Sequence, residues 1–90
     1  MEVQWTKKVN ARLEEIEAYI AHESPAASAK VILTIIKKTA TQLSRYPDSG
    51  KPGRLMGTRE FLFSDTPYLF VYTVRNNIMT ILTIFHKRAR

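Results

Sequence analysis

The stretch from Thr58 to His86, TREFLFSDTPYLFVYTVRNNIMTILTIFH, decides the fold. Apolar and aromatic residues alternate along it with a period close to two, which is typical of β-strands and not of helices. Two polar segments interrupt it, Asp65–Pro67 and Asn76–Asn77, and the asparagine pair can adopt the positive φ angles of a tight hairpin turn. The pattern predicts three successive antiparallel strands, over residues 58–64, 68–75 and 78–86.

The same alternation assigns side chains to the two faces of this sheet. We expect Arg59 and Phe61 to share one face of the first strand, because successive side chains point to opposite sides. In the last strand, Ile81 and Phe85 should share a face opposite Ile84.

A helical pattern precedes the strands. Thr6 can cap a first helix, whose apolar stripe has the 3/4 spacing of one helix face: Val9, Leu13, Ile16 and Ile20. Ser24 and Pro25 then have the residue types of a second helix start, which should run to about Ser44. Because the connection is so short, the two helices should form an antiparallel hairpin.

These elements predict an α+β fold with the order β-α-α-β-β-β, the first strand lying over residues 2–5. The helical hairpin should pack on one face of a small antiparallel sheet, and residues 1–90 should form a single domain. The other sheet face would be open. We expect it to expose apolar residues unless a partner covers them: Leu69, Val71, Ile81 and Phe85.

Composition narrows the function classes. The chain has 14 Lys and Arg against 8 Asp and Glu, a net charge of +6, and residues 51–90 hold +5 of it, with seven basic and two acidic residues. Such asymmetry suggests a polyanionic or acidic partner, although a solubilising surface would look the same. Without cysteine there is no disulfide or thiolate nucleophile, and two dispersed histidines make a metal site improbable, so we expect no metal and no cofactor. We see no membrane span and no secretory leader, and we expect a cytoplasmic protein.

Few residues could support catalysis. A metal-independent ribonuclease needs a base, an acid and cations around the scissile phosphate. Four residues could in principle compose such a site: Lys51, Arg59, His86 and Arg88. The same residues could equally form a basic docking surface without turnover.

Three motifs resemble one family. YPDSGKPGR at residues 46–54, GTRE at 57–60 and PYLFVY at 67–72, followed by a strand that ends in His86, are similar to the RelE/ParE superfamily of bacterial toxins. The resemblance covers essentially the whole chain and implies the same strand and helix order. It also implies the toxin of a type II toxin–antitoxin module, silenced by a small antitoxin that wraps around it in a hetero-oligomer.

The superfamily divides by target. RelE-like members cut mRNA on the ribosome, whereas ParE-like members poison DNA gyrase. Arg88 and His86 match positions of RelE-like nucleases, but Leu69 stands where those nucleases have an arginine that grips the phosphate, and leucine cannot replace a guanidinium. The resemblance therefore favours a ParE-like toxin that acts by binding. An mRNA endonuclease and a degenerate toxin that only binds its antitoxin remain alternatives.

Two sets of contact residues follow from this interpretation. The target should meet cations and the carboxy-terminal histidine: Arg54, Arg59, Arg75, His86, Lys87 and Arg88. Arg59 could instead be structural, paired with a carboxylate or a carbonyl. The antitoxin should present a disordered, acidic and apolar segment that folds onto the helices and the open sheet face. Its apolar contacts should be Leu13, Ile20, Leu69, Val71, Ile81 and Phe85.

Overall fold

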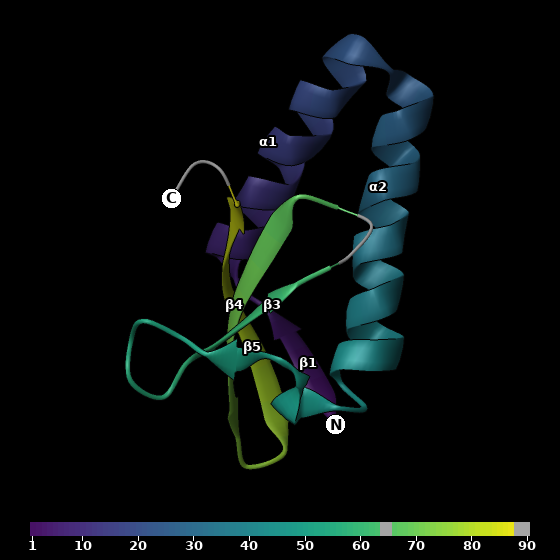
Figure 1. The fold of residues 1–90 in the computed structure, drawn as a ribbon. Helices are drawn as coiled ribbons and strands as arrows, with labels where there is room; N and C mark the ends of the chain where they lie inside the picture. The colour runs from purple at the N-terminus through teal and green to yellow at the C-terminus, as the bar shows by residue number, and fades with distance from the viewer. Residues whose placement is uncertain (64–65, 88–90) are drawn as a thin grey trace.

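A five-stranded sheet with two helices on one side makes up the described part of the chain, residues 1–63 and 66–87 of a computed structural model (Figure 1). In chain order the elements are β1 (Glu2–Trp5), α1 (Lys7–Glu23), α2 (Pro25–Lys38), β2 (Lys51–Pro52), β3 (Arg59–Leu62), β4 (Tyr68–Arg75) and β5 (Ile78–His86). The predicted α+β class and the helical hairpin are confirmed.

The helices begin where their caps predict. The Thr6 hydroxyl accepts a hydrogen bond from the Val9 N–H at 3.2 Å, and the Ser24 hydroxyl accepts one from the Ala27 N–H at 3.3 Å. The Ser28 hydroxyl donates to the Glu17 carbonyl at 2.8 Å and so ties α2 to α1. After Lys38 a π-helical turn, Thr39–Leu43, carries the helix to its expected end.

The sheet is mixed, with the strand order β1-β5-β4-β3-β2. β3, β4 and β5 are antiparallel neighbours, as predicted, but β1 pairs in parallel with β5, starting at Glu2 opposite Ile78. The expectation of a purely antiparallel sheet was therefore wrong, because the helical hairpin returns the chain across the sheet and so permits a parallel neighbour. The two-residue strand β2 was not predicted either, since Pro52 stands inside a segment that reads as a loop.

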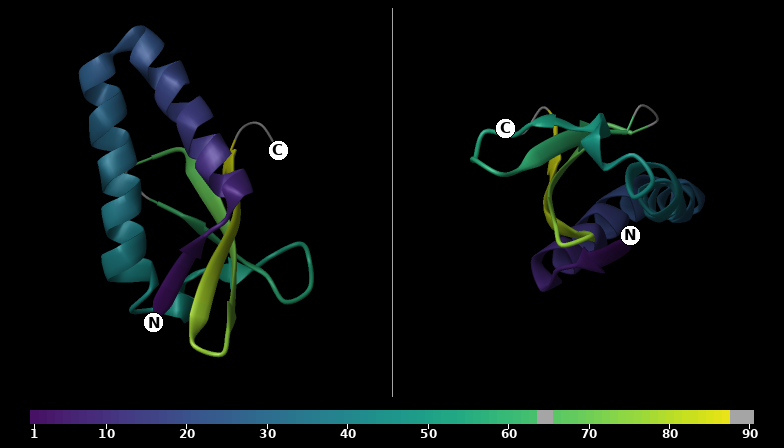
Figure 2. Two further views of the ribbon diagram at one scale, coloured as in Figure 1. Left: turned by 180° about the vertical axis from the view of Figure 1, so that it is seen from behind. Right: turned by 90° about the horizontal axis from the view of Figure 1, so that it is seen from below.

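The core lies between the helices and the facing side of the sheet (Figure 2). Aromatic side chains of this layer meet edge to face, with ring centroids 4.8 Å apart for Phe63 and Phe70 and 6.3 Å apart for Trp5 and Phe70. Val9 of α1 and Ile35 of α2 are fully buried against this layer. The apolar stripe of the helices is therefore buried against one face of the sheet, and the other face is not covered by helices.

A β-bulge changes which residues face the core. Val71 lies opposite Thr83, but its neighbour Tyr72 lies opposite Ile81, so Leu82 is an extra residue in β5. Ile81 therefore shares the helix-facing side with Tyr72 and is fully buried. The expectation that Ile81 is exposed on the open face was wrong, because it assumed an unbroken alternation.

Candidate binding site on the open sheet face

The open face is formed by side chains that point away from the helices. Leu62, Leu69 and Phe85 stand side by side across β3, β4 and β5 in the strand register. Leu69 is only 5% exposed and Val71 is also buried, whereas Leu62 and Phe85 are exposed. The expected exposure of Leu69 and Val71 is thus wrong, because β4 is the central strand and its side chains are covered by those of both neighbours. The expected exposure of Phe85 is confirmed.

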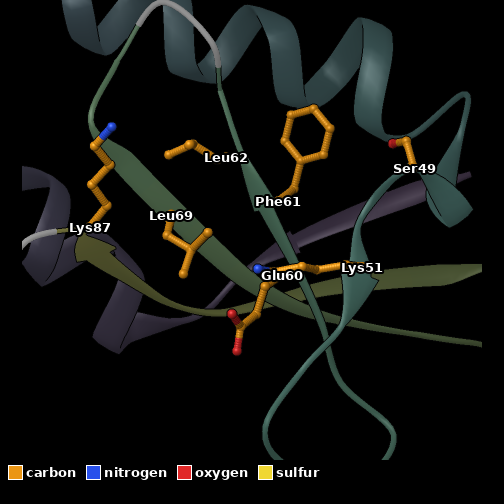
Figure 3. A pocket seen from close by; sticks show the side chains of 7 residues that line it. All are labelled: Ser49, Lys51, Glu60, Phe61, Leu62, Leu69 and Lys87. Atoms are coloured by element: carbon orange, nitrogen blue, oxygen red, sulfur yellow. The ribbon is translucent and has the colours of Figure 1, made fainter. Parts of the chain in front are cut away.

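A hollow of about 570 Å³ opens on this face (Figure 3). Leu62 and Leu69 form an apolar surface within it, and Lys51 and Lys87 stand on different sides of them. Its full lining comes from a 3₁₀ turn before β2 (Pro47–Ser49), the strands β2 to β4 and the end of β5: Ser49, Lys51, Glu60, Phe61, Leu62, Leu69 and Lys87. The hollow therefore combines an apolar centre with two cations, a surface suited to a ligand that is itself part apolar and part anionic.

Glu60 contributes a carboxylate to the same hollow, although it is only 7% exposed. Its Oε2 accepts a hydrogen bond from the main-chain N–H of Arg54 at 3.3 Å, and Lys51 is its partner in the strand register. The carboxylate thus holds the loop between β2 and β3. The sequence prediction missed Glu60; its place beside Arg59 in the GTRE motif was the available signal.

Arg59 lies on the opposite side of β3, facing Tyr72 in the register. Its Nη1 donates to the Gly50 carbonyl at 2.6 Å, and its Nη2 lies 3.7 Å from the Asp48 carboxylate. These contacts favour the structural alternative for Arg59, because they occupy the guanidinium with the turn that precedes β2. They do not direct it into the hollow.

Tyr72 also holds the turn that precedes β2. Its hydroxyl donates to the Pro47 carbonyl at 2.6 Å and accepts from the Gly50 N–H at 3.1 Å. A Cβ on Gly50 would collide with this hydroxyl, so glycine permits the close approach. Burial raises the pKa of Tyr72, and the phenol therefore stays neutral in the folded state. Through this turn, Arg59 and Tyr72 position Ser49 and Lys51 at the hollow.

His86 lies on the helix-facing side, opposite Tyr68 in the register. The two rings meet edge to face with centroids 5.5 Å apart, and with Tyr19 of α1 they line a separate hollow of about 360 Å³. Lys87, the next residue, lines the open-face hollow instead. The structure therefore does not bring His86 together with Lys51 and Arg59 as a nuclease site would require, and Arg88 lies outside the described residues.

The remaining predicted contact residues are dispersed. Arg75 is exposed at the end of β4, where its guanidinium lies beside Gly57, and Arg54 is exposed in the loop between β2 and β3. Lys87 lies at the other end, its N–H bonded to the Pro67 carbonyl at 2.8 Å. At a rise of about 3.4 Å per residue, the eight residues of β4 separate Arg75 from the end that carries Lys87 by roughly 24 Å. On α1, Leu13 and Ile20 are half-buried against the core, so little of either side chain is available to a partner.

Residues 3–90 match the model of a family described as the ParE toxin of type II toxin–antitoxin systems, parDE. The chain belongs to this family. It is 39% identical over 84 residues to "Putative toxin Y4kP" of Sinorhizobium fredii, a match that covers 93% of this chain and 85% of that protein. The predicted membership of the RelE/ParE superfamily, and with it the assignment as a type II toxin, is confirmed.

Two solved structures share the fold of this ParE-family chain. One comes from the chromosomal ParDE system of P. aeruginosa, with a TM-score of 0.82, 24% identity, and coverage of 96% of this chain and 95% of that one. The other comes from the RelBE2 toxin–antitoxin complex of Mycobacterium tuberculosis, with a TM-score of 0.70, 22% identity, and coverage of 94% and 95%. This chain thus shares its fold with chains from both a ParDE and a RelBE2 system.

Two absences hold for the described residues of this ParE-family chain. Within 1–63 and 66–87, no three His, Asp or Glu side chains lie close enough together to hold a metal ion. In the same ranges, no helix has the length and apolar character to cross a bilayer.

Proposed function

We propose that this toxin acts in the ParE manner, by binding DNA gyrase without cutting RNA, and that the open-face hollow is part of the binding surface. The observation that carries the proposal is Leu69. It occupies the position at which RelE-like nucleases are expected to have a phosphate-gripping arginine, and here it is a buried apolar residue of the hollow. Without that guanidinium, the charge that develops on the scissile phosphate would lack its main stabilising contact.

The arrangement of the other candidates supports the same proposal. Arg59 could have compensated for Leu69, but it faces the other side of β3 and bonds to Gly50. His86 packs against Tyr68 on the helix side. A surface with an apolar centre, two lysines and one carboxylate suits a polypeptide partner better than a bare phosphodiester, because leucine side chains gain nothing from a charged backbone.

We also propose a cognate antitoxin as the second partner, in a cytoplasmic hetero-oligomer. The solved relatives come from toxin–antitoxin systems, and the chain shares their fold. The exposed Leu62 and Phe85 on the open face are the apolar contacts that such a partner would cover.

Two assays on the purified chain test the mode of action. In a gyrase assay we expect loss of supercoiling and accumulation of a cleaved gyrase–DNA complex. With translating ribosomes we expect mRNA to remain intact. Cleavage of mRNA at codon-defined positions would overturn the proposal in favour of an mRNA endonuclease. His86 and Arg88, which match positions of RelE-like nucleases, would then be candidates for its active site. Activity in neither assay, together with no growth arrest on induction without antitoxin, would indicate a degenerate toxin.

A further inference from the structure

The loop between β2 and β3, which we call the tip loop (residues 53–58), exposes two adjacent apolar side chains. Leu55 is 70% exposed and Met56 is fully exposed. Figures 1 and 2 show this loop extending away from the sheet and from both helices. Its two apolar side chains contribute nothing to the core and gain nothing from water, and grouped exposed apolar residues mark an interaction surface.

Hydrogen bonds fix the shape of the tip loop. The Gly53 N–H donates to the Thr58 carbonyl at 2.8 Å, and the Thr58 N–H and hydroxyl both donate to the Leu55 carbonyl, at 3.1 and 2.6 Å. Gly57 has a φ of 83°, a left-handed value that favours glycine and lets the chain turn back after Met56. The loop therefore presents its tip in one conformation, so that binding a partner there loses little conformational entropy.

The charge around the tip is positive. Arg54 is exposed on one side of it, and the guanidinium of Arg75, at the end of β4, lies beside Gly57 on the other. Residues 50–59 include no aspartate or glutamate, and the carboxylate that follows, Glu60, is buried and accepts a hydrogen bond from the Arg54 N–H at 3.3 Å. A rigid apolar tip between two guanidinium groups attracts an anionic partner that also offers apolar surface.

We infer that the tip loop contacts duplex DNA, with Leu55 and Met56 inserted between base steps from the minor groove and Arg54 and Arg75 on the flanking phosphates. This inference rests on the proposed function, because gyrase supplies the DNA. Leucine and methionine are among the side chains that minor-groove proteins insert as wedges, with arginine beside them. Phosphates offer no apolar surface, so the tip gains from DNA only by reaching sugars and bases. A protein pocket fits less well, because interfaces with DNA are the more positively charged kind.

The position of the tip loop gives the toxin two separate contacts. Arg75 and the end of the open-face hollow that carries Lys87 lie at opposite ends of β4, roughly 24 Å apart. The hollow suits a polypeptide, whereas the tip loop suits DNA. A toxin that holds the enzyme at one end and its DNA at the other links the two, which explains why a cleaved gyrase–DNA complex would accumulate.

Fluorescence anisotropy of the full-length chain with a short labelled DNA duplex, at low salt and without gyrase, tests the contact. We expect Leu55→Ser with Met56→Ser to raise Kd about tenfold, because two side chains lose their burial against DNA. The matched control changes two exposed apolar residues of α2, Leu33→Ser with Ile36→Ser, and should leave Kd unaltered. In a duplex with 2-aminopurine at flexible TA steps, wild type should raise the fluorescence by unstacking the base, and the tip-loop variant should not.

The dependence of Kd on salt tests the two arginines. Arg54→Gln and Arg75→Gln should each reduce the slope of log Kd against log salt concentration by about 1, because each removes one phosphate contact. Arg45→Gln, at an exposed arginine outside the tip loop, should leave the slope unaltered.

The outcomes separate this inference from the proposed function. If wild type does not bind the duplex, or if the tip-loop variant binds it equally well, the inference is overturned, and the supercoiling assay still decides the proposed function. If wild type binds gyrase without DNA and the tip-loop variant does not, the tip is a contact with the enzyme, and the inference is again overturned. If wild type binds DNA through the tip but leaves supercoiling intact, the proposed function fails and the DNA contact stands. Matching circular dichroism spectra for all variants show that the comparison is between folded proteins.

Discussion

At the residue scale, the Tyr72 hydroxyl is the link between the sheet and the turn that carries Ser49 and Lys51. Tyr72→Phe removes one donated and one accepted hydrogen bond from a buried position. We expect the free energy of unfolding to fall by about 1–3 kcal/mol, because the Gly50 N–H and the Pro47 carbonyl lose a partner. Urea denaturation measures the change, and Tyr46→Phe, at an exposed tyrosine, should leave the stability unaltered.

The close approach of Gly50 to the same hydroxyl supplies a second prediction. Gly50 has a φ of −76°, which alanine adopts readily, so the cost of Gly50→Ala comes from the collision with Tyr72 and not from the backbone. We expect Gly50→Ala to be destabilising, and less so in a Tyr72→Phe background. Additive losses in this double-mutant cycle would show that the two residues are not coupled.

Titration of Tyr72 makes the stability of the folded chain depend on pH. Burial raises the pKa of Tyr72 above 10.0, so the unfolded state releases its proton at a lower pH than the folded state does. Stability from this residue is fully present below pH 10 and falls as the pH rises above it. Denaturant midpoints between pH 8 and 11 should decline, and Tyr72→Phe should reduce the decline. The residual slope includes Tyr68, whose pKa burial also raises.

At the element scale, Thr6 joins α1 to the sheet. Its hydroxyl caps α1 through the Val9 N–H and also donates to the Ile81 carbonyl at 3.0 Å, whereas the Ser24 hydroxyl has the capping bond with Ala27. Removing a capping side chain costs about 1 kcal/mol, so Thr6→Ala should cost more than Ser24→Ala. Thr6→Ser keeps both bonds and should be nearly neutral. Thermal unfolding of the three variants measures their relative stabilities. Equal losses of stability for the two alanine variants would contradict the prediction.

What the sequence could predict was local. The caps at Thr6 and Ser24, and the hairpin turn at Asn76–Asn77 with its φ angles of 52° and 61°, depend on neighbouring residues, and all of them were predictable. The parallel pairing of β1 with β5 joins residues more than seventy positions apart, and no periodicity within either strand encodes it. The bulge at Leu82 was not predicted either, because only the pairing with the partner strand shows which residue is extra.

The same distinction applies to the candidate site. Leu69 could be singled out from its motif, and Lys51 and Lys87 from their charge, but the faces to which they belong depended on the register. Arg59 and His86 were expected beside them and lie on the other side of the sheet. Glu60 was missed although it stands beside Arg59 in the GTRE motif, and Leu62 was missed because no pattern marks it before the strands are aligned.

At the scale of the whole molecule, the open face and its cations should govern the effect on the target. Lys87→Glu changes the hollow without touching the core, since its main-chain bond to Pro67 does not involve the side chain. We expect a loss of growth arrest of about tenfold or more in plating assays, because a second carboxylate in the hollow that Glu60 also lines would oppose an acidic partner. Lys7→Glu, an identical change at the exposed start of α1, should preserve growth arrest; equal effects of both variants would refute a role for the hollow.

The pairing of β1 with β5 also has a consequence for synthesis. The amino-terminal strand leaves the ribosome first, but its neighbour in the sheet is the last strand to be made. Until Ile78 and the residues after it emerge, Trp5 has no strand beside it and the sheet lacks an edge. We therefore expect a chain whose translation stops before β5 to lack the complete sheet and to be inactive, so that a new toxin molecule becomes competent only on completion. Any antitoxin already present meets it at that moment.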